Sequence, residues 1–100
     1  MSRWARRVDG SQQDVARTLR ACGWWVCDLS RAGGGVPDLL IAKAGRLALV
    51  EVKTPKTWRG RQHTPAQRDF YANCPVPVVV LRTVDETLAW AQRQEARREI

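Results

Sequence analysis

Two carboxylates and a lysine have the types and spacing that metal-dependent hydrolysis requires. Asp38 follows a proline, and after twelve intervening residues come Glu51 and Lys53 with one valine between them. Carboxylate oxygens bind hard divalent cations such as Mg²⁺, which keeps several waters when bound. A lysine beside such a cation can stabilise phosphate charge or position the attacking water. The three residues therefore indicate phosphoryl chemistry if the fold brings them together.

The segments that carry these residues have the composition of a β-hairpin. Pro37–Ala42 and Leu47–Lys53 are short and rich in Leu, Ile and Val, which favours two strands. Ala44-Gly45 is a suitable tight turn between them. Counting outward from this turn places Asp38 opposite Glu51.

Opposed acids on a hairpin need an explanation, because directly facing residues hold their Cβ atoms roughly 4.5–5.5 Å apart and like charges repel. Lys53 lies two residues beyond Glu51 and therefore on the same face. A cation between the acids would remove the repulsion. The alternative is a solvated Asp-Glu-Lys ladder at the edge of a sheet.

Length and charge limit the possible partners. The chain has 100 residues and a net charge of +7. This length is typical of one domain with its own core, so residues 1–100 are expected to form a single domain. The charge favours an acidic partner, with nucleic acid first, although a membrane-surface or ribosomal protein can have the same balance.

The cysteines and the apolar runs favour a cytoplasmic protein. Cys22, Cys27 and Cys74 are odd in number and lack CxxC spacing, and His63 is the single histidine. We expect reduced, buried thiols and no zinc site. No apolar run approaches the ~18 residues of a membrane helix, and no apolar signal segment follows the arginine-rich start.

The first part of the chain predicts a basic arm, a helix and a strand. The arm covers residues 1–10. Ser11 and Asp14 have the spacing of a capping box, which gives Asp14 a structural explanation, and Gly23 would end the helix. Trp24–Leu29 is expected to form a strand. The apolar stripe of the helix consists of Val15, Leu19 and Cys22.

Two loops beside the hairpin are candidates for nucleic-acid contacts. Gly34 and Gly35 either let the backbone approach a phosphate closely or form a loose connection. Residues 54–63 contain no acid, and their cations with Trp58 suit a nucleic-acid backbone and an exposed base. An ordinary solvated loop is the alternative. The candidate cations are Lys56, Arg59 and Arg61.

A second helix is predicted to begin at Thr64-Pro65-Ala66-Gln67. This segment offers a cap, a proline at the first helical position and a capping-box glutamine. Gln67 is either the partner of the cap or a polar group directed at a metal-bound water. The apolar residues that follow are Phe70, Tyr71 and Cys74.

A buried strand and a last helix complete the expected elements. Val76–Leu81 is β-branched, and its prolines stand at the start of the strand. Thr83 or Asp85 is the expected cap of the helix, and residues 93–100 are expected to be a solvated face or a frayed tail. The residues expected to face inward are Val84, Leu88 and Ala91. Trp24, Trp25 and Trp90 are expected in the core rather than at an interface.

The order of helix, three strands, helix, strand and helix is that of the restriction-endonuclease-like fold, an α/β fold with an αβββαβα core and a mixed central sheet. The Pro-Asp and Glu-Val-Lys pattern resembles the core motif of PD-(D/E)XK nucleases. The whole chain resembles a stand-alone VRR-NUC domain of the kind found in bacteriophages. The matching segments are Arg7–Asp9, Gln12, Gly35–Leu40, Val50–Lys53, Thr64–Gln67, Phe70, the Val78–Val80 run and Asp85-Glu86.

The resemblance implies a role for particular residues. Lys53 would be catalytic, and Gln67 matches the glutamine of the family at the start of the second helix. An acid from the first helix often joins the metal site, but the family usually has Glu where this chain has Asp. The implied ligands of Mg²⁺ or Mn²⁺ are Asp38, Glu51, the carbonyl of Val52 and Asp14.

The activity implied by the resemblance is hydrolysis of DNA phosphodiesters. Branched DNA such as four-way junctions would be the substrate, a homodimer the active form, and a bacterial or phage-infected cell the setting. The alternative is a basic DNA-binding module or regulatory subunit that keeps the fold without cutting. Such a module gains nothing from opposed carboxylates. An RNA-binding or ribosome-associated protein would account for the charge but for neither the hairpin nor its acids.

Overall fold

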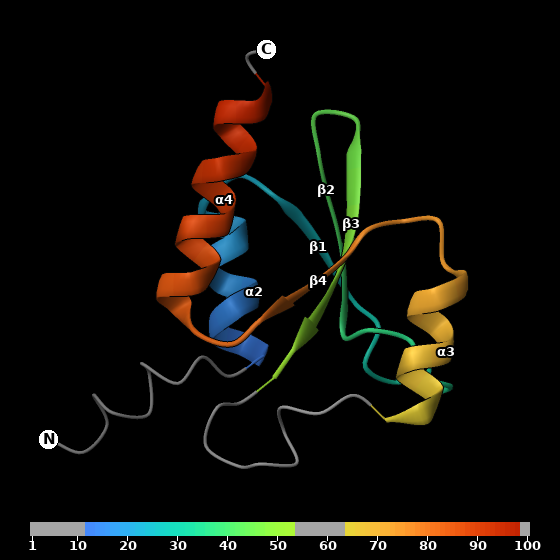
Figure 1. Ribbon diagram of the computed structural model, residues 1–100. Coiled ribbons are helices and arrows are strands. Elements are labelled where there is room, and N and C mark those ends of the chain that lie inside the picture. Colours follow the sequence, from blue (N-terminus) through green and yellow to red (C-terminus); the bar gives the residue numbers. More distant parts are fainter. Residues whose placement is uncertain (1–11, 54–63, 99–100) are drawn as a thin grey trace, which may run out of the picture.

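The computed structural model describes residues 12–53 and 64–98, which form an α/β fold (Figure 1). The predicted basic arm over residues 1–10 and the cationic segment 54–63 lie outside the described residues. The elements are α2 (Gln12–Ala21), β1 (Trp25–Asp28), β2 (Leu39–Lys43), β3 (Arg46–Val52), α3 (Pro65–Asn73), β4 (Val78–Leu81) and α4 (Val84–Arg98). Their order is the predicted one.

The four strands form one mixed sheet in the order β1-β2-β3-β4. β1, β2 and β3 pair antiparallel, and β4 pairs parallel with β3. A parallel pair needs a crossover connection, and α3 lies in the connection between β3 and β4. The predicted mixed sheet is therefore confirmed.

The turn of the hairpin has the predicted position and sets the predicted register. Ala44 and Gly45 have φ angles of 53° and 80°. Two consecutive positive values are typical of a type I′ turn, whose twist suits the strands of a hairpin. Lys43 pairs with Arg46 and Leu39 with Val50. One further step places Asp38 opposite Glu51.

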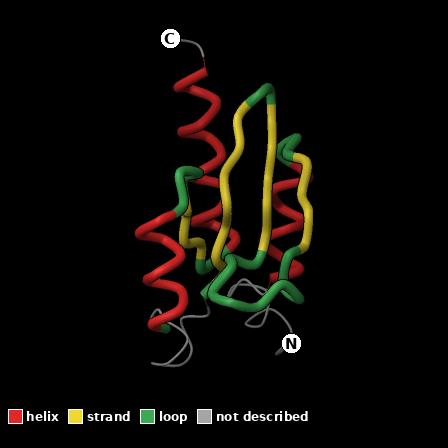
Figure 2. The backbone as a smooth tube through the Cα atoms, turned by 90° about the vertical axis from the view of Figure 1, so that its right-hand side faces the viewer, coloured by secondary structure: helices red, strands yellow, loops and turns green. Residues whose placement is uncertain are grey.

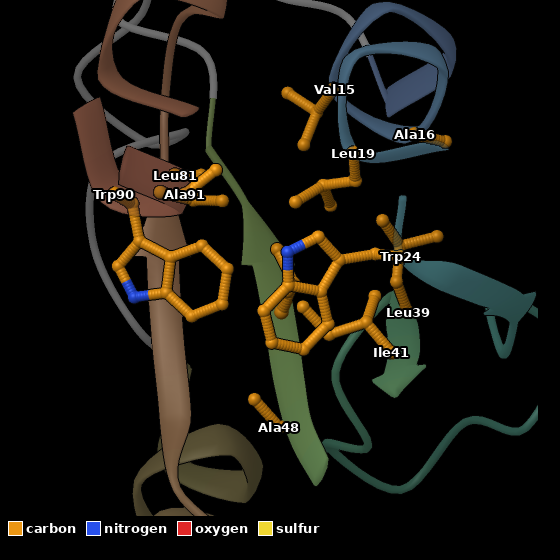
Figure 3. Close-up of a cluster of buried hydrophobic side chains, with 11 residues drawn as sticks. Val15, Ala16, Leu19, Trp24, Leu39, Ile41, Ala48, Leu81, Trp90 and Ala91 are labelled. Carbon is orange, nitrogen blue, oxygen red and sulfur yellow. The ribbon is translucent and has the colours of Figure 1, made fainter. Parts of the chain in front are cut away.

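The core lies between one face of the sheet and the helices α2 and α4 (Figures 1 and 3). Val15 and Leu19 on α2 are fully buried, as their helical spacing predicts. The indoles of Trp24 and Trp90 meet with ring centroids 5.1 Å apart. The buried residues of the cluster are Val15, Ala16, Leu19, Trp24, Leu39, Ile41, Ala48, Val50, Leu81, Trp90 and Ala91.

Helix α3 lies on the other side of the sheet (Figure 1). Seen from that side, no helix of the described residues crosses in front of β1 and β2 (Figure 2). The expectation that Trp25 belongs to the core is wrong, because 58% of this residue is exposed. Its position in β1 directs it away from α2 and α4, while Trp24 just before the strand enters the core.

The inner face of α4 differs from the expected one. Leu88 is 40% exposed, whereas Thr87 is fully buried and donates its hydroxyl to the carbonyl of Thr83. The Thr83 hydroxyl accepts the amide hydrogen of Glu86, which identifies Thr83 as the cap. The prediction is thus wrong for Leu88, whose place is taken by Thr87, while Ala91 is buried as predicted.

Residues 93–98, expected to be a solvated face or a frayed tail, continue α4 and are mostly exposed where their side chains are described, so they form the solvated face. Arg46 donates to the main-chain carbonyl and the side-chain oxygen of Gln94 at 3.0 and 2.5 Å. Lys43 forms an ion pair with Glu95 at 2.7 Å. These contacts fasten the hairpin to the helix.

The three cysteines are free, but they are half-buried rather than buried as predicted. None of the helices in the described part of the chain is long and apolar enough to cross a membrane.

Candidate active site

Four of the predicted site residues meet at one end of the sheet. Asp38 stands just before β2, Glu51 near the end of β3, and Lys53 directly after it. The first turn of α3 contributes Gln67 from the other side. The site is thus built from two strand ends and one helix N-terminus, which the hairpin and the crossover bring together.

Asp38 is held by the backbone of the opposite strand. Its Oδ2 accepts the amide hydrogen of Val52 at 2.9 Å. Continuing the register of the hairpin by two residues places Pro37 opposite Val52. Proline has no N–H, so it cannot donate to the carbonyl of Val52. The predicted ligand role of this carbonyl is compatible with that geometry.

Glu51, Gln67 and Lys53 form one hydrogen-bonded chain. The side-chain amide of Gln67 donates to Glu51 Oε2 at 2.9 Å, and its oxygen accepts from Lys53 Nζ at 3.0 Å. Lys53 Nζ lies 3.6 Å from the same Glu51 oxygen. Glu51 and Lys53 are only 5% and 7% exposed. The predicted solvated ladder is therefore not what this part of the chain forms.

Gln67 fulfils the predicted capping role and also reaches the site. Its oxygen accepts the amide hydrogen of Thr64 at 2.9 Å, and its own amide hydrogen goes to the Thr64 hydroxyl at 3.1 Å. This is a capping box, with Pro65 in the first turn. The side chain points at Glu51 and Lys53, so the cap also holds two site residues.

The surroundings of Glu51 disfavour the charged form of its carboxylate. Burial and then the negative charge of Asp38 raise its pKa above the ordinary value, while Lys53 and Gln67 act in the opposite direction. Glu51 Oε1 is buried and has no hydrogen-bond partner among the described residues. A buried unsatisfied oxygen next to a second acid suits a divalent cation, which prefers oxygen ligands.

A contact within its own helix distinguishes Asp14 from the four central residues. Its carboxylate forms an ion pair with Arg17 at 3.0 Å on α2. Among residues 12–53 and 64–98, no three His, Cys, Asp or Glu side chains form a group that could hold a metal. The ligand role of Asp14 stays a prediction, and its cap partner Ser11 lies outside the described residues.

The two predicted glycines differ in their surroundings. Gly35 has a φ of 80°, and a Cβ there would clash with the carbonyl of Ala66 and lie 2.8 Å from the amide nitrogen of Gln67. Gly35 therefore allows the loop to touch the first turn of α3. Gly34 is exposed with open space around it. The loop cations Lys56, Arg59 and Arg61 lie outside the described residues.

Tyr71 is a site neighbour that the sequence analysis treated only as apolar surface. It follows Gln67 by one helical turn and so lies on the same face of α3. Burial and the charges of Glu51 and Asp38 raise the pKa of its hydroxyl, so Tyr71 keeps its proton at neutral pH. The spacing of four residues from Gln67 is the signal that could have indicated it.

Arg17 and Arg20 are further residues that the sequence analysis did not single out. They line a surface cavity of about 320 Å³ together with Gln12, Asp28 and Leu39. Leu39 belongs to the core face of the sheet, so this cavity lies on the α2 side, whereas Glu51 and Lys53 meet Gln67 on the α3 side. Two arginines three residues apart are neighbours on one face of a helix, and this spacing could have indicated a basic patch in the sequence.

No family model matches the sequence, and comparisons with curated proteins and with solved structures find no match either.

The raised pKa of Glu51 can be measured directly. In metal-free protein, carboxyl ¹³C NMR should give Glu51 a midpoint above 4.5, its ordinary value. The folded chain then holds this proton more tightly than the unfolded chain. Protonation of Glu51 therefore stabilises the folded chain fully below about pH 4.5, and this stabilisation is lost as the pH rises through the pKa of Glu51 in the folded chain.

Asp38→Asn should lower this midpoint, because it removes one of the two causes of the shift. Asp28→Asn is the control, since Asp28 is exposed and bonded instead to Ser30 and Gln12. A wild-type midpoint at or below 4.5 would contradict the account.

Gly35→Ala tests the contact that places Gln67. Gly33→Ala is the matched control, because Gly33 has a φ of 73° but nothing within 4 Å of its Cβ position. Both variants carry backbone strain of about 1–2 kcal/mol. Gly35→Ala should lose about 1–3 kcal/mol more in urea unfolding, since it also overpacks the first turn of α3. Equal losses would show that the contact with α3 is unimportant.

Proposed function

We propose that the chain is a divalent-metal-dependent DNA endonuclease with a restriction-endonuclease-like core. The observation that carries this proposal is the buried oxygen of Glu51 beside Asp38, with Lys53 and Gln67 bonded into the same cluster. A structural ion pair of Glu51 and Lys53 would need neither a second acid across the hairpin nor an unsatisfied oxygen.

Asp38, Glu51 and the carbonyl of Val52 would hold Mg²⁺ or Mn²⁺. When bound, the cation would lower the pKa of a water and polarise the phosphate. Lys53 offers its positive charge to the phosphate oxygens or orients the attacking water, because its ammonium lies within 3.6 Å of Glu51. Gln67 keeps Glu51 and Lys53 in place.

DNA as the substrate is supported by charge. The chain carries a net charge of +7, and Arg17 and Arg20 line a surface cavity on the α2 side of the sheet. Phosphate contacts by arginine provide most of the sequence-independent affinity for DNA. The cations predicted in residues 54–63, which lie outside the described residues, would add further phosphate contacts. Branched DNA, a homodimer and a bacterial or phage-infected cell belong to the proposal through the resemblance to VRR-NUC domains.

Cleavage assays test the proposal. End-labelled four-way junction, flap and duplex DNA are incubated with Mg²⁺ or Mn²⁺, with EDTA as the control. Asp38→Asn, Glu51→Gln and Lys53→Ala should each lower the cleavage rate by at least about 100-fold, because each removes a preorganised charge at the phosphate. DNA binding in EDTA should be retained.

Glu95→Gln is the control for the loss of one carboxylate. Glu95 is exposed on α4 and pairs with Lys43 beside the hairpin turn, at the opposite end of β2 from Asp38. The variant should leave cleavage unchanged. Retained cleavage in both Asp38→Asn and Lys53→Ala would refute the proposed site. Binding of DNA by the wild-type chain without cutting in either metal would favour a non-cleaving DNA-binding module.

A further inference from the structure

An apolar row crosses the open part of the sheet. Trp25 on β1 pairs with Ala42 on β2, which pairs with Leu47 on β3. Residues directly opposite each other share a face of the sheet. Trp25 and Leu47 are 58% and 52% exposed, although both belong to strands. We call Trp25, Ala42 and Leu47 the apolar row.

The apolar row lies on the same sheet face as the candidate site. Leu47 and Glu51 are four residues apart on β3, and alternation returns every second side chain to one face. Among the described helices, α3 reaches the Glu51 end of this face, and none lies over β1 and β2 in Figure 2. A molecule bound at Glu51 and Lys53 can therefore extend along the sheet to Trp25.

The size of the row argues against a second copy of the chain as its occupant. A Trp side chain covers at most about 250 Å². A standard interface needs about 800 Å² from each partner. The row alone is therefore too small for such an interface.

An unpaired nucleobase matches the row in shape and chemistry. Indole rings bind single-stranded nucleic acid by stacking on bases, and this contact tolerates any sequence. The positive charge of the chain attracts the phosphates that accompany the base. Leu47 and Ala42 extend the platform with side chains that need no hydrogen bonds.

The spacing between the row and the site limits where the base can lie. Trp25 is separated from Glu51 by four residues along the strands and by two strand spacings. Because these two separations are perpendicular, the straight-line distance across the sheet is about 17 Å. In B-form DNA this span equals about five base-pair steps of about 3.4 Å.

We propose that Trp25, supported by Leu47, stacks on an unpaired base of DNA that is bound at the candidate site. The proposal rests on the proposed nuclease function and names its substrate class. The substrate is DNA whose strands separate within about five steps of the cut. Fully paired duplex lacks the unpaired base and gains nothing from Trp25.

The test measures binding in EDTA, so its outcome does not depend on cleavage. The probes are a duplex with a central three-base bubble, which carries 2-aminopurine as one unpaired base, and the same duplex fully paired. Trp25→Ala should weaken binding of the bubble by about 10-fold, the effect of losing one stacked base. Affinity for the paired duplex should change by less than about twofold on the same reasoning.

Trp25→Phe should recover most of the bubble affinity, because a phenyl ring also stacks. Binding of wild-type protein should quench the 2-aminopurine emission, and Trp25→Ala should not. Leu88→Ala is the control, since Leu88 is similarly exposed on α4. Urea unfolding checks that the Trp25 variants fold.

Three outcomes would overturn the stacking proposal. The first is an equal loss of affinity for both probes, and the second is an unchanged bubble affinity in Trp25→Ala. The third is a wild-type dimer that Trp25→Ala converts to a monomer in sedimentation, which would make the row an interface between copies. Selective stacking without cleavage in either Mg²⁺ or Mn²⁺ would instead refute only the nuclease function.

Discussion

The repulsion between Glu51 and Asp38 is the constraint on which the site depends. The two acids face each other across the hairpin, and Glu51 is almost fully buried. A carboxylate in this position needs positive charge and hydrogen-bond donors. Lys53 and Gln67 supply them to one oxygen, and the other oxygen has no partner among the described residues. This unpartnered oxygen is the place where the proposed cation would bind.

Backbone features outside the acid cluster maintain this arrangement. The turn at Ala44-Gly45 fixes the register that sets Asp38 against Glu51. Gly35 lets the loop contact the first turn of α3, whose capping box aims Gln67 at the site. A change in any of these features would move a site residue without altering its chemistry.

The sequence predicted the parts of this structure that local rules govern. Turn chemistry determined the register, and the capping box determined where α3 begins. The errors concern which side of an element is covered, as for Trp25 and Leu88. Both are apolar, and strand or helix periodicity alone does not say which face another element covers. Tyr71 could have been found from its spacing of four residues from Gln67, although its proximity to the two acids is a tertiary property.

Binding of Mn²⁺ to the DNA-free protein tests the central claim most directly. Paramagnetic Mn²⁺ broadens NMR signals of nearby nuclei, so titration with small amounts identifies its position. The account predicts that the signals of Asp38, Glu51 and Val52 broaden first, and that Asp38→Asn abolishes this effect. Broadening that centres on exposed acids such as Asp28 or Asp85, with Glu51 unaffected, would contradict it.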